Sequence, residues 1–172
     1  MEIKEAPDYS TVEELTDSWK QIRKELLFFI EALPEETFSQ HRDDHWSFSK
    51  VCEHLYLSQL PVGIIIKKLL KSPPEHAAAP DYSELKARLL AEKNVKNPDI
   101  VSPAHEYSRE EIKSHLEKSE AKMLSSLQGL QKADLAARTL EHPLAGKVSL
   151  FDWLWIMVLH EKRHLEIMRR RV

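Results

Sequence analysis

Apolar residues recur at intervals of three and four along most of this chain, and that interval is the period of an α-helix. Four long segments show the pattern: residues 11–33, 47–71, 108–129, and a last one that begins at residue 149. No segment shows a convincing alternation of apolar and polar residues, which is the pattern of a half-buried strand. The sequence therefore predicts an all-α protein whose helices each turn one apolar face toward a shared core.

Capping residues indicate where these helices begin and end. Three helix starts have a serine followed three residues later by an acidic residue, which is capping-box spacing: Ser10 with Glu13, Ser108 with Glu111, and Ser149 with Asp152. Pro34 ends the first helix, and Gly129 is suited to end the third. Pro61 lies inside the second segment, where a proline removes a backbone hydrogen bond, so we expect a kink there.

A long proline-containing stretch, residues 72–107, separates the second and third helices. Within it, residues 83–93 have the apolar spacing of a short helix. Connections of this length inside a compact domain are often lids, binding loops or interface elements. Residues 143–147 are interpreted as a turn before the last helix. Four helices with one long crossover predict a four-helix bundle, formed by a single domain over residues 1–172.

The composition is that of an ordinary globular protein, with 42% hydrophobic and 31% charged residues among 172. A chain of this length can bury a sizeable core without disulfide or metal staples. Its net charge of -3 argues against a nucleic-acid-binding protein, which normally carries a basic face. The arginines at 169–171 are too few to change this, and we interpret them as solvated residues at a helix end, favoured by the helix dipole.

Several features favour a cytoplasmic location. Cys52 is the single cysteine, so no intramolecular disulfide forms, which agrees with a reducing compartment. Residues 1–5 are too charged for a signal peptide. The apolar runs at 60–66 and 150–159 are too short to span a bilayer, which takes about 20 residues. We therefore expect a protein that does not associate with membranes.

The last helix carries a candidate metal site. His160 and His164 project from the same helix face, with Cβ atoms about 5–6 Å apart. They share that face with apolar residues, and burying two unpartnered imidazoles would cost free energy. The pair therefore indicates metal binding, with two satisfied core histidines as the alternative. His54 lies near the apolar stripe of the second helix and is a candidate third ligand, because bundle sites are built from facing helices.

The same residues match the H-E-x-x-H zinc motif, in which Glu161 would be the general base of a protease. Such proteases also need a third ligand downstream, and only eight residues follow His164. Lys162 and Arg163 follow Glu161, so a salt-bridged helix surface explains the glutamate equally well. We therefore do not expect a protease.

Three segments resemble motifs of the DinB/YfiT superfamily. Residues 46–55 resemble the entry to its second helix, with a tryptophan eight residues before a ligand histidine. Residues 142–150 resemble its His-Pro turn into the last helix, and residues 160–165 resemble its closing H-x-x-x-H motif. We expect Trp46 and His142 of these motifs to anchor the loop beneath the site.

The resemblance runs through the whole chain in order and spacing. It implies a four-helix bundle, usually homodimeric, with His54, His160 and His164 as ligands of zinc, nickel or a similar divalent ion. Family members often have Gln or His three residues after the last ligand, where this chain has Ile167. A polar partner of the site is therefore absent at that position.

The resemblance also implies an enzyme with a small-molecule substrate. Some members are thiol S-transferases that act with bacillithiol, mycothiol or glutathione, and others are described as metal-dependent hydrolases. One mycothiol-dependent branch is a maleylpyruvate isomerase, and many members have no assigned activity. We expect a thiol S-transferase acting on small electrophiles with a low-molecular-weight thiol. A hydrolase of the same fold and a non-enzymatic stress-related bundle protein remain as alternatives.

The expected chemistry follows from the ligand set. Three neutral imidazoles leave the charge of a divalent ion uncompensated, and such a site keeps a position open. A thiol bound there would be deprotonated, and a water would have its pKa lowered to about 7. Cys52 precedes His54 by two residues, so at about 100° per residue it points away from the ligand face. We interpret it as a small buried residue and not as a nucleophile.

Overall fold

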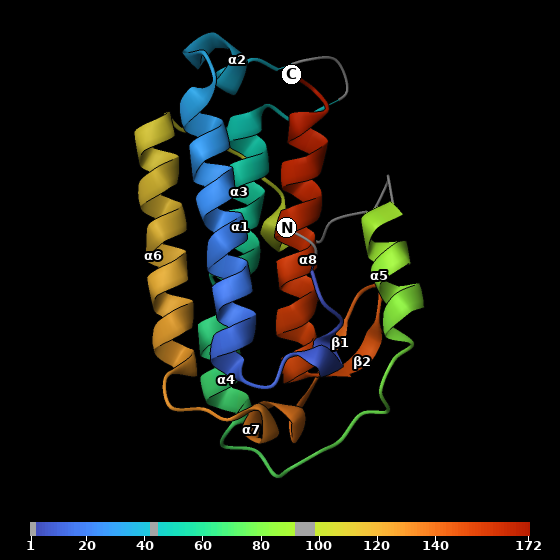
Figure 1. The fold of residues 1–172 in the computed structure, drawn as a ribbon. Helices are drawn as coiled ribbons and strands as arrows, with labels where there is room; N and C mark the ends of the chain where they lie inside the picture. Colours follow the sequence, from blue (N-terminus) through green and yellow to red (C-terminus); the bar gives the residue numbers. More distant parts are fainter. Residues whose placement is uncertain (1–2, 42–44, 92–98) are drawn as a thin grey trace.

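The computed structural model describes residues 3–41, 45–91 and 99–172. Within these residues, four long helical units lie side by side (Figure 1): α1 (Val12–Ala32), α3 (Phe48–Gln59) continued by α4 (Val62–Leu69), α6 (Arg109–Leu127) and α8 (Leu150–Arg169). α1 and α8 run in one direction, whereas α3 and α6 run in the other. The predicted all-α four-helix bundle is confirmed.

The long crossover follows from these directions. Because α3 and α6 are parallel neighbours, the chain has to return along the bundle after α4 before α6 begins (Figure 1). The crossover contains α5 (Tyr82–Ala91) and the 3-10 turn η2 (Asp99–Val101). The short helix predicted over residues 83–93 is confirmed as far as residue 91, and residues 92 and 93 lie outside the described residues.

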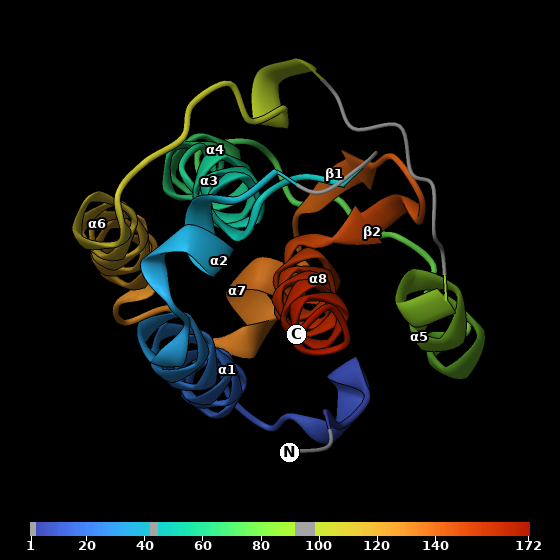
Figure 2. The same ribbon diagram turned by 90° about the horizontal axis from the view of Figure 1, so that it is seen from above.

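α5 packs against the outer face of α8 (Figure 2). Leu85 and Leu89 are buried there. The Tyr82 hydroxyl donates a hydrogen bond of 3.0 Å to Asp152, and its ring meets Trp155 edge-on at 5.6 Å. The crossover is therefore a packed part of the domain.

Two helix starts follow the predicted caps. Ser108 and Glu111 form a complete capping box at the start of α6. The Ser149 hydroxyl accepts the N–H of Asp152 at 3.0 Å and caps α8. Gly129 follows α6 with φ 77°, in the left-handed region that favours glycine. These local signals were sufficient to place both helices.

Two other boundaries differ from the prediction. α1 begins one residue later, because the Thr11 hydroxyl and not that of Ser10 accepts the N–H of Glu14, at 3.0 Å. Ser10 instead donates its main-chain N–H to the Glu14 carboxylate at 2.8 Å. At Pro61 the expected kink is a break that separates α3 from α4, and the Pro61 carbonyl accepts the N–H of Ile65 at 3.0 Å.

A small antiparallel hairpin precedes α8, where the sequence predicted only a turn. β1 (Thr139–His142) pairs with β2 (Gly146–Ser149), with Thr139 opposite Ser149 and His142 opposite Gly146. Gly146 has φ 66°, which a glycine adopts without strain. The strands are four residues each, too short for an alternating pattern to be recognised in the sequence.

Shorter elements cover the ends of the bundle. α2 (Glu35–Ser39) lies at the upper end and α7 (Lys132–Ala136) at the lower end in Figure 1, while η1 (Ala6–Asp8) precedes α1. The core between the four helical units includes large side chains that are fully buried: Trp19, Trp155, Phe38, Phe151, Leu26 and Leu55. Among the described residues, no helix combines the length and the apolar character needed to cross a membrane.

The end of α8 is tied to the start of α3. Arg171 donates a hydrogen bond of 2.8 Å to the carbonyl of Trp46, and its guanidinium lies 4.9 Å from the centre of the Phe48 ring. The prediction that the terminal arginines are solvated is wrong for Arg171, because the bundle end offers it a carbonyl acceptor and an aromatic face. This contact also holds Trp46 beside the site described next.

Candidate metal centre

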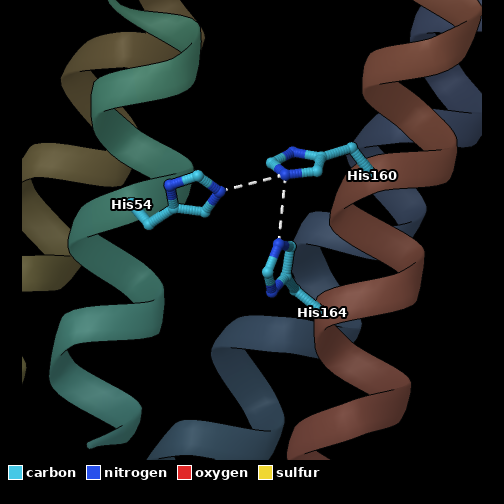
Figure 3. A group of neighbouring side chains, drawn as sticks. All are labelled: His54, His160 and His164. Carbon is cyan, nitrogen blue, oxygen red and sulfur yellow. Dashed lines mark hydrogen bonds between the residues drawn. The ribbon is translucent and has the colours of Figure 1, made fainter. Parts of the chain in front are cut away.

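Three histidines converge between α3 and α8. His54 projects from α3, and His160 and His164 project from α8 toward it (Figure 3). The Nε2 atom of His160 lies 3.1 Å from that of His54 and 3.0 Å from that of His164. One nitrogen of each ring lies within 4.8 Å of the others. The structure therefore brings together the three residues that the sequence singled out.

These distances suit a single metal ion. With metal–nitrogen bonds of about 2.0–2.1 Å, two nitrogen ligands of a tetrahedral ion lie about 3.3 Å apart. The two nitrogen–nitrogen contacts of 3.1 and 3.0 Å are close to that value. A set of three imidazoles suits zinc, nickel, copper and iron alike.

The protonation states also suit metal binding. The Nδ1–H of His54 donates to the Val101 carbonyl at 2.8 Å, so its Nε2 keeps a lone pair directed at the site. Burial lowers the pKa of His54, and the Arg163 charge adds to this. Burial, and next the neighbouring imidazoles, hold the pKa of His160 and His164 well below the usual value. All three rings are therefore neutral at pH 7 and can donate lone pairs.

The crossover segment that carries Val101 is fastened to α3. Glu53, whose side chain is buried, accepts the main-chain N–H and the Nδ1–H of His105, each at 2.8 Å. Ser49 donates to the Tyr107 carbonyl at 2.8 Å and accepts the Tyr107 N–H at 2.9 Å. α3 thus carries one candidate ligand and also fixes the segment that orients it.

Glu161 faces another part of the molecule. Its side chain is fully buried at 0% exposure, and its carboxylate accepts from Arg23 Nε and Trp19 Nε1, both at 2.6 Å. The sequence interpretation of a salt bridge is right, but the location at a helix surface is wrong, because the partner is Arg23 of α1 inside the core. With its oxygens bound there, Glu161 is not placed to act as a general base.

Trp46 and His142 belong to two of the sequence motifs and were predicted to anchor the loop beneath the site. The Trp46 ring lies 5.3 Å from the ring of His54. The Nδ1 atom of His142 accepts the N–H groups of Leu144 and Ala145 at 3.1 and 3.2 Å, which closes the turn of the hairpin. Burial lowers the pKa of His142 to about 4, so it stays neutral at pH 7. His142 thus anchors its loop, as expected.

Two residues near the ligands provide no ligand atom. Cys52 is buried, and burial raises the pKa of its thiol to about 12, so it is not a nucleophile, as predicted. Ile167 is half-buried one turn after His164, and its aliphatic side chain cannot bind a metal.

Sequence reasoning missed two parts of this arrangement. Nothing in the sequence could have indicated the Val101 carbonyl, because every residue type carries that group. The sequence did offer an indication for Arg23, which is a charged residue on the apolar face of the first predicted helix, directly after Ile22 and three residues before Leu26. A buried charge requires a partner, and that requirement could have directed attention to Glu161.

The fold and the site together define a helical-bundle protein with a candidate metal centre formed by three histidines. The sequence profile of the DinB superfamily matches residues 18–168. The chain therefore belongs to the DinB superfamily, as its motifs indicated.

Other proteins resemble this chain in sequence or in fold. The uncharacterized protein YuaE of Bacillus subtilis (strain 168) is 25% identical over 144 residues, which are 81% of this chain and 86% of YuaE. The crystal structure of TT2238, a four-helix bundle protein, has a TM-score of 0.63 at 20% identity, covering 91% of this chain and 96% of TT2238. YfiT from Bacillus subtilis, described as a probable metal-dependent hydrolase with an unusual four-helix bundle topology, has a TM-score of 0.59 at 17% identity, covering 99% and 93%. The two structures share the fold of this chain.

Proposed function

We propose that this protein is an enzyme in which His54, His160 and His164 bind one divalent metal ion, zinc or nickel. The convergence of the three Nε2 atoms carries this proposal. The probable metal dependence of YfiT, which has the same fold, supports it. The ligands come from two helices of a packed bundle, so the site is preorganised to receive an ion without rearrangement of the backbone.

The residues of the chain have defined roles in this proposal. A divalent ion in the site would lower the pKa of a thiol or water in its remaining coordination position. The Val101 carbonyl keeps His54 in the tautomer that presents Nε2. The neutral imidazoles leave the charge of the ion uncompensated, which favours an anionic partner such as a thiolate. Trp46 packs on the His54 ring and reduces the access of water to it.

Thiol activation is our first candidate reaction, in the form of a thiol S-transferase acting on small electrophiles. Hydrolysis commonly employs a carboxylate general base, as in H-E-x-x-H proteases. Among the described residues, no carboxylate joins the group of the three histidines, and Glu161 is bound to Arg23. A thiol has a pKa of about 8.5, and coordination alone is sufficient to ionise it. The site therefore suits a thiol cosubstrate.

A metal-dependent hydrolase is the second candidate, favoured by the description of YfiT. A stress-related protein without enzymatic activity is the third. We also propose that the protein is a cytoplasmic homodimer. Light scattering would measure its oligomeric state in solution. None of these alternatives changes the identity of the metal ligands.

Metal analysis tests the site. Protein purified without chelators is expected to contain about one zinc or nickel ion per chain, and His54→Ala, His160→Ala and His164→Ala are each expected to lose it. His76→Ala, at an exposed position outside the site, is the matched control and should keep the metal. Wild-type protein that binds neither ion would refute the proposed function.

A thiol panel separates the reactions. The metal-loaded protein is mixed with a chromogenic electrophile and either bacillithiol, mycothiol, glutathione or no thiol. Turnover that requires one of the thiols supports the transferase, and turnover of an ester substrate without thiol supports the hydrolase. Metal-bound protein without either activity would favour the non-enzymatic role.

A further inference from the structure

Five buried polar side chains meet in the core, and none of them is a candidate metal ligand. They are Trp19 and Arg23 of α1, Gln59 of α3, Ser119 of α6 and Glu161 of α8, each at most 2% exposed. We refer to them as the ion-pair cluster. Each of the four helical units of the bundle contributes to it, so the cluster joins the whole bundle at one level.

The centre of the cluster is a two-point ion pair. Arg23 donates from Nε to one carboxylate oxygen of Glu161 at 2.6 Å and from Nη2 to the other at 2.9 Å. Nη1 donates to the Leu116 carbonyl of α6 at 2.9 Å and lies 3.7 Å from the Glu120 carboxylate, and Nη2 also donates to the Gln59 side-chain oxygen at 2.7 Å. These short, directed bonds leave the guanidinium little freedom to shift.

The cluster connects the two helices that carry the histidines. Glu161 directly follows His160 and lies three residues before His164 on α8, while Gln59 lies five residues after His54 on α3. The Gln59 amide donates to the Glu161 carboxylate at 2.7 Å, so one hydrogen bond joins α3 to α8 directly. A rotation or slide of α8 against α3 would break this bond and separate the imidazoles at the same time.

Stability alone does not explain such a cluster. Replacing a buried ion pair by apolar residues of similar volume is often neutral or stabilising, because burying two charges is costly. Apolar contacts tolerate small sliding motions, whereas charge-assisted hydrogen bonds require a defined geometry. The cluster is therefore suited to fixing the position of α8 more than to holding the fold together.

We propose that the ion-pair cluster is a positioning device for the three-histidine site. Arg23, Gln59 and Glu161 set the rotation and axial register of α8 against α3, so that the three Nε2 atoms converge at distances suited to one ion. They are positioning residues that do not touch the ion. The inference rests on the proposed function, since it takes a metal ion as the ligand of the site.

A triple variant tests the proposal: Arg23→Met with Gln59→Leu and Glu161→Met, which replaces the charges by apolar groups of similar size. Cobalt(II) is the probe, because its visible spectrum reports coordination geometry and competition with a coloured chelator gives its affinity. Removing residues that orient metal ligands from outside typically lowers metal affinity about 10–100-fold. We expect the folded triple variant to bind cobalt more weakly than wild type by a factor of that order. Its spectrum should change as well.

Leu135→Ala is the control for stability. Leu135 is fully buried in α7, at the lower end of the bundle in Figure 1, so its truncation weakens the core without touching the cluster. At a temperature well below its Tm, this variant should bind cobalt as wild type does. Equal losses in Leu135→Ala and in the triple variant would overturn the proposal, because metal affinity would then simply follow stability.

Gln59→Leu alone keeps the ion pair and removes the direct bond between α3 and α8. It decides the question if the triple variant does not fold. Weaker cobalt binding with a normal Tm supports positioning, and wild-type affinity and spectrum in either folded variant would overturn it. Wild-type protein that fails to bind cobalt, zinc and nickel would overturn the proposed function itself, which is a distinct result.

Discussion

Acidification from pH 7.5 to 5.5 is expected to destabilise the metal-free protein strongly. His54, His142, His160 and His164 all have a pKa in the folded state below the ordinary value of 6.5, with burial as the largest cause. As the pH falls through 6.5, the unfolded chain binds protons that these folded imidazoles do not take up. Stability is therefore retained above pH 6.5 and lost as the pH falls toward the folded-state pKa values.

The size of the effect follows from linkage. Between pH 7.5 and 5.5, each histidine that stays neutral in the folded state contributes a loss of about 1.4 kcal/mol. Four such residues give at most about 5 kcal/mol, which is a large part of the 5–15 kcal/mol that stabilises a typical domain. Glu120 acts in the opposite direction, because burial raises the pKa of its carboxyl and the folded state gains a proton earlier.

Urea unfolding in the presence of a chelator at the two pH values measures this loss. His142→Asn is the matched variant, because the asparagine Oδ1 takes the place of Nδ1 and can still accept the N–H groups of Leu144 and Ala145. It should reduce the loss by about 1.4 kcal/mol, the share of one histidine. A wild-type loss smaller than that single share would refute the reasoning that the four imidazoles stay neutral in the folded state.

Three further predictions concern individual side chains. Cys52 should react with a thiol reagent at pH 8 only after unfolding, because its pKa is raised to about 12; rapid labelling of native protein would contradict this. Glu53→Gln should lower the free energy of unfolding by about 1–3 kcal/mol, since it weakens two hydrogen bonds from His105. It should also weaken cobalt binding, because the crossover is held less firmly. An unchanged cobalt titration would show that the crossover does not influence the site. Thr11→Ala should cost about 1 kcal/mol in urea unfolding because it removes the α1 cap, whereas Ser10→Ala should cost almost nothing; the reverse order would assign the cap to Ser10.

Local signals in the sequence were sufficient for most of the bundle. The helical period and the caps at Ser108 and Ser149 placed α6 and α8, and Pro61 marked the division of the second segment. The start of α1 was misplaced by one residue because Ser10 and Thr11 are both good caps. Only the relative position of their oxygens and the Glu14 N–H decides between them.

The site was partly predictable for a similar reason. His160 and His164 were identified by their helical spacing, and His54 by its place near the apolar stripe of the second helix and by the family motif. The partners of Glu161 were not found, because they lie up to 142 residues away in the sequence. Local periodicity cannot say which of two charged residues on different helices meet, and tertiary packing determines that pairing.

The acceptor for the His54 Nδ1–H is the main-chain carbonyl of Val101, and this has an evolutionary consequence. A main-chain group is present whatever the side chain, so residue 101 is free to vary among descendants of this chain while the acceptor persists. Selection can act instead on the length of the crossover and on Glu53 and Ser49, the residues of α3 that hold it. Insertions and deletions in the crossover would disturb the site more than substitutions at residue 101.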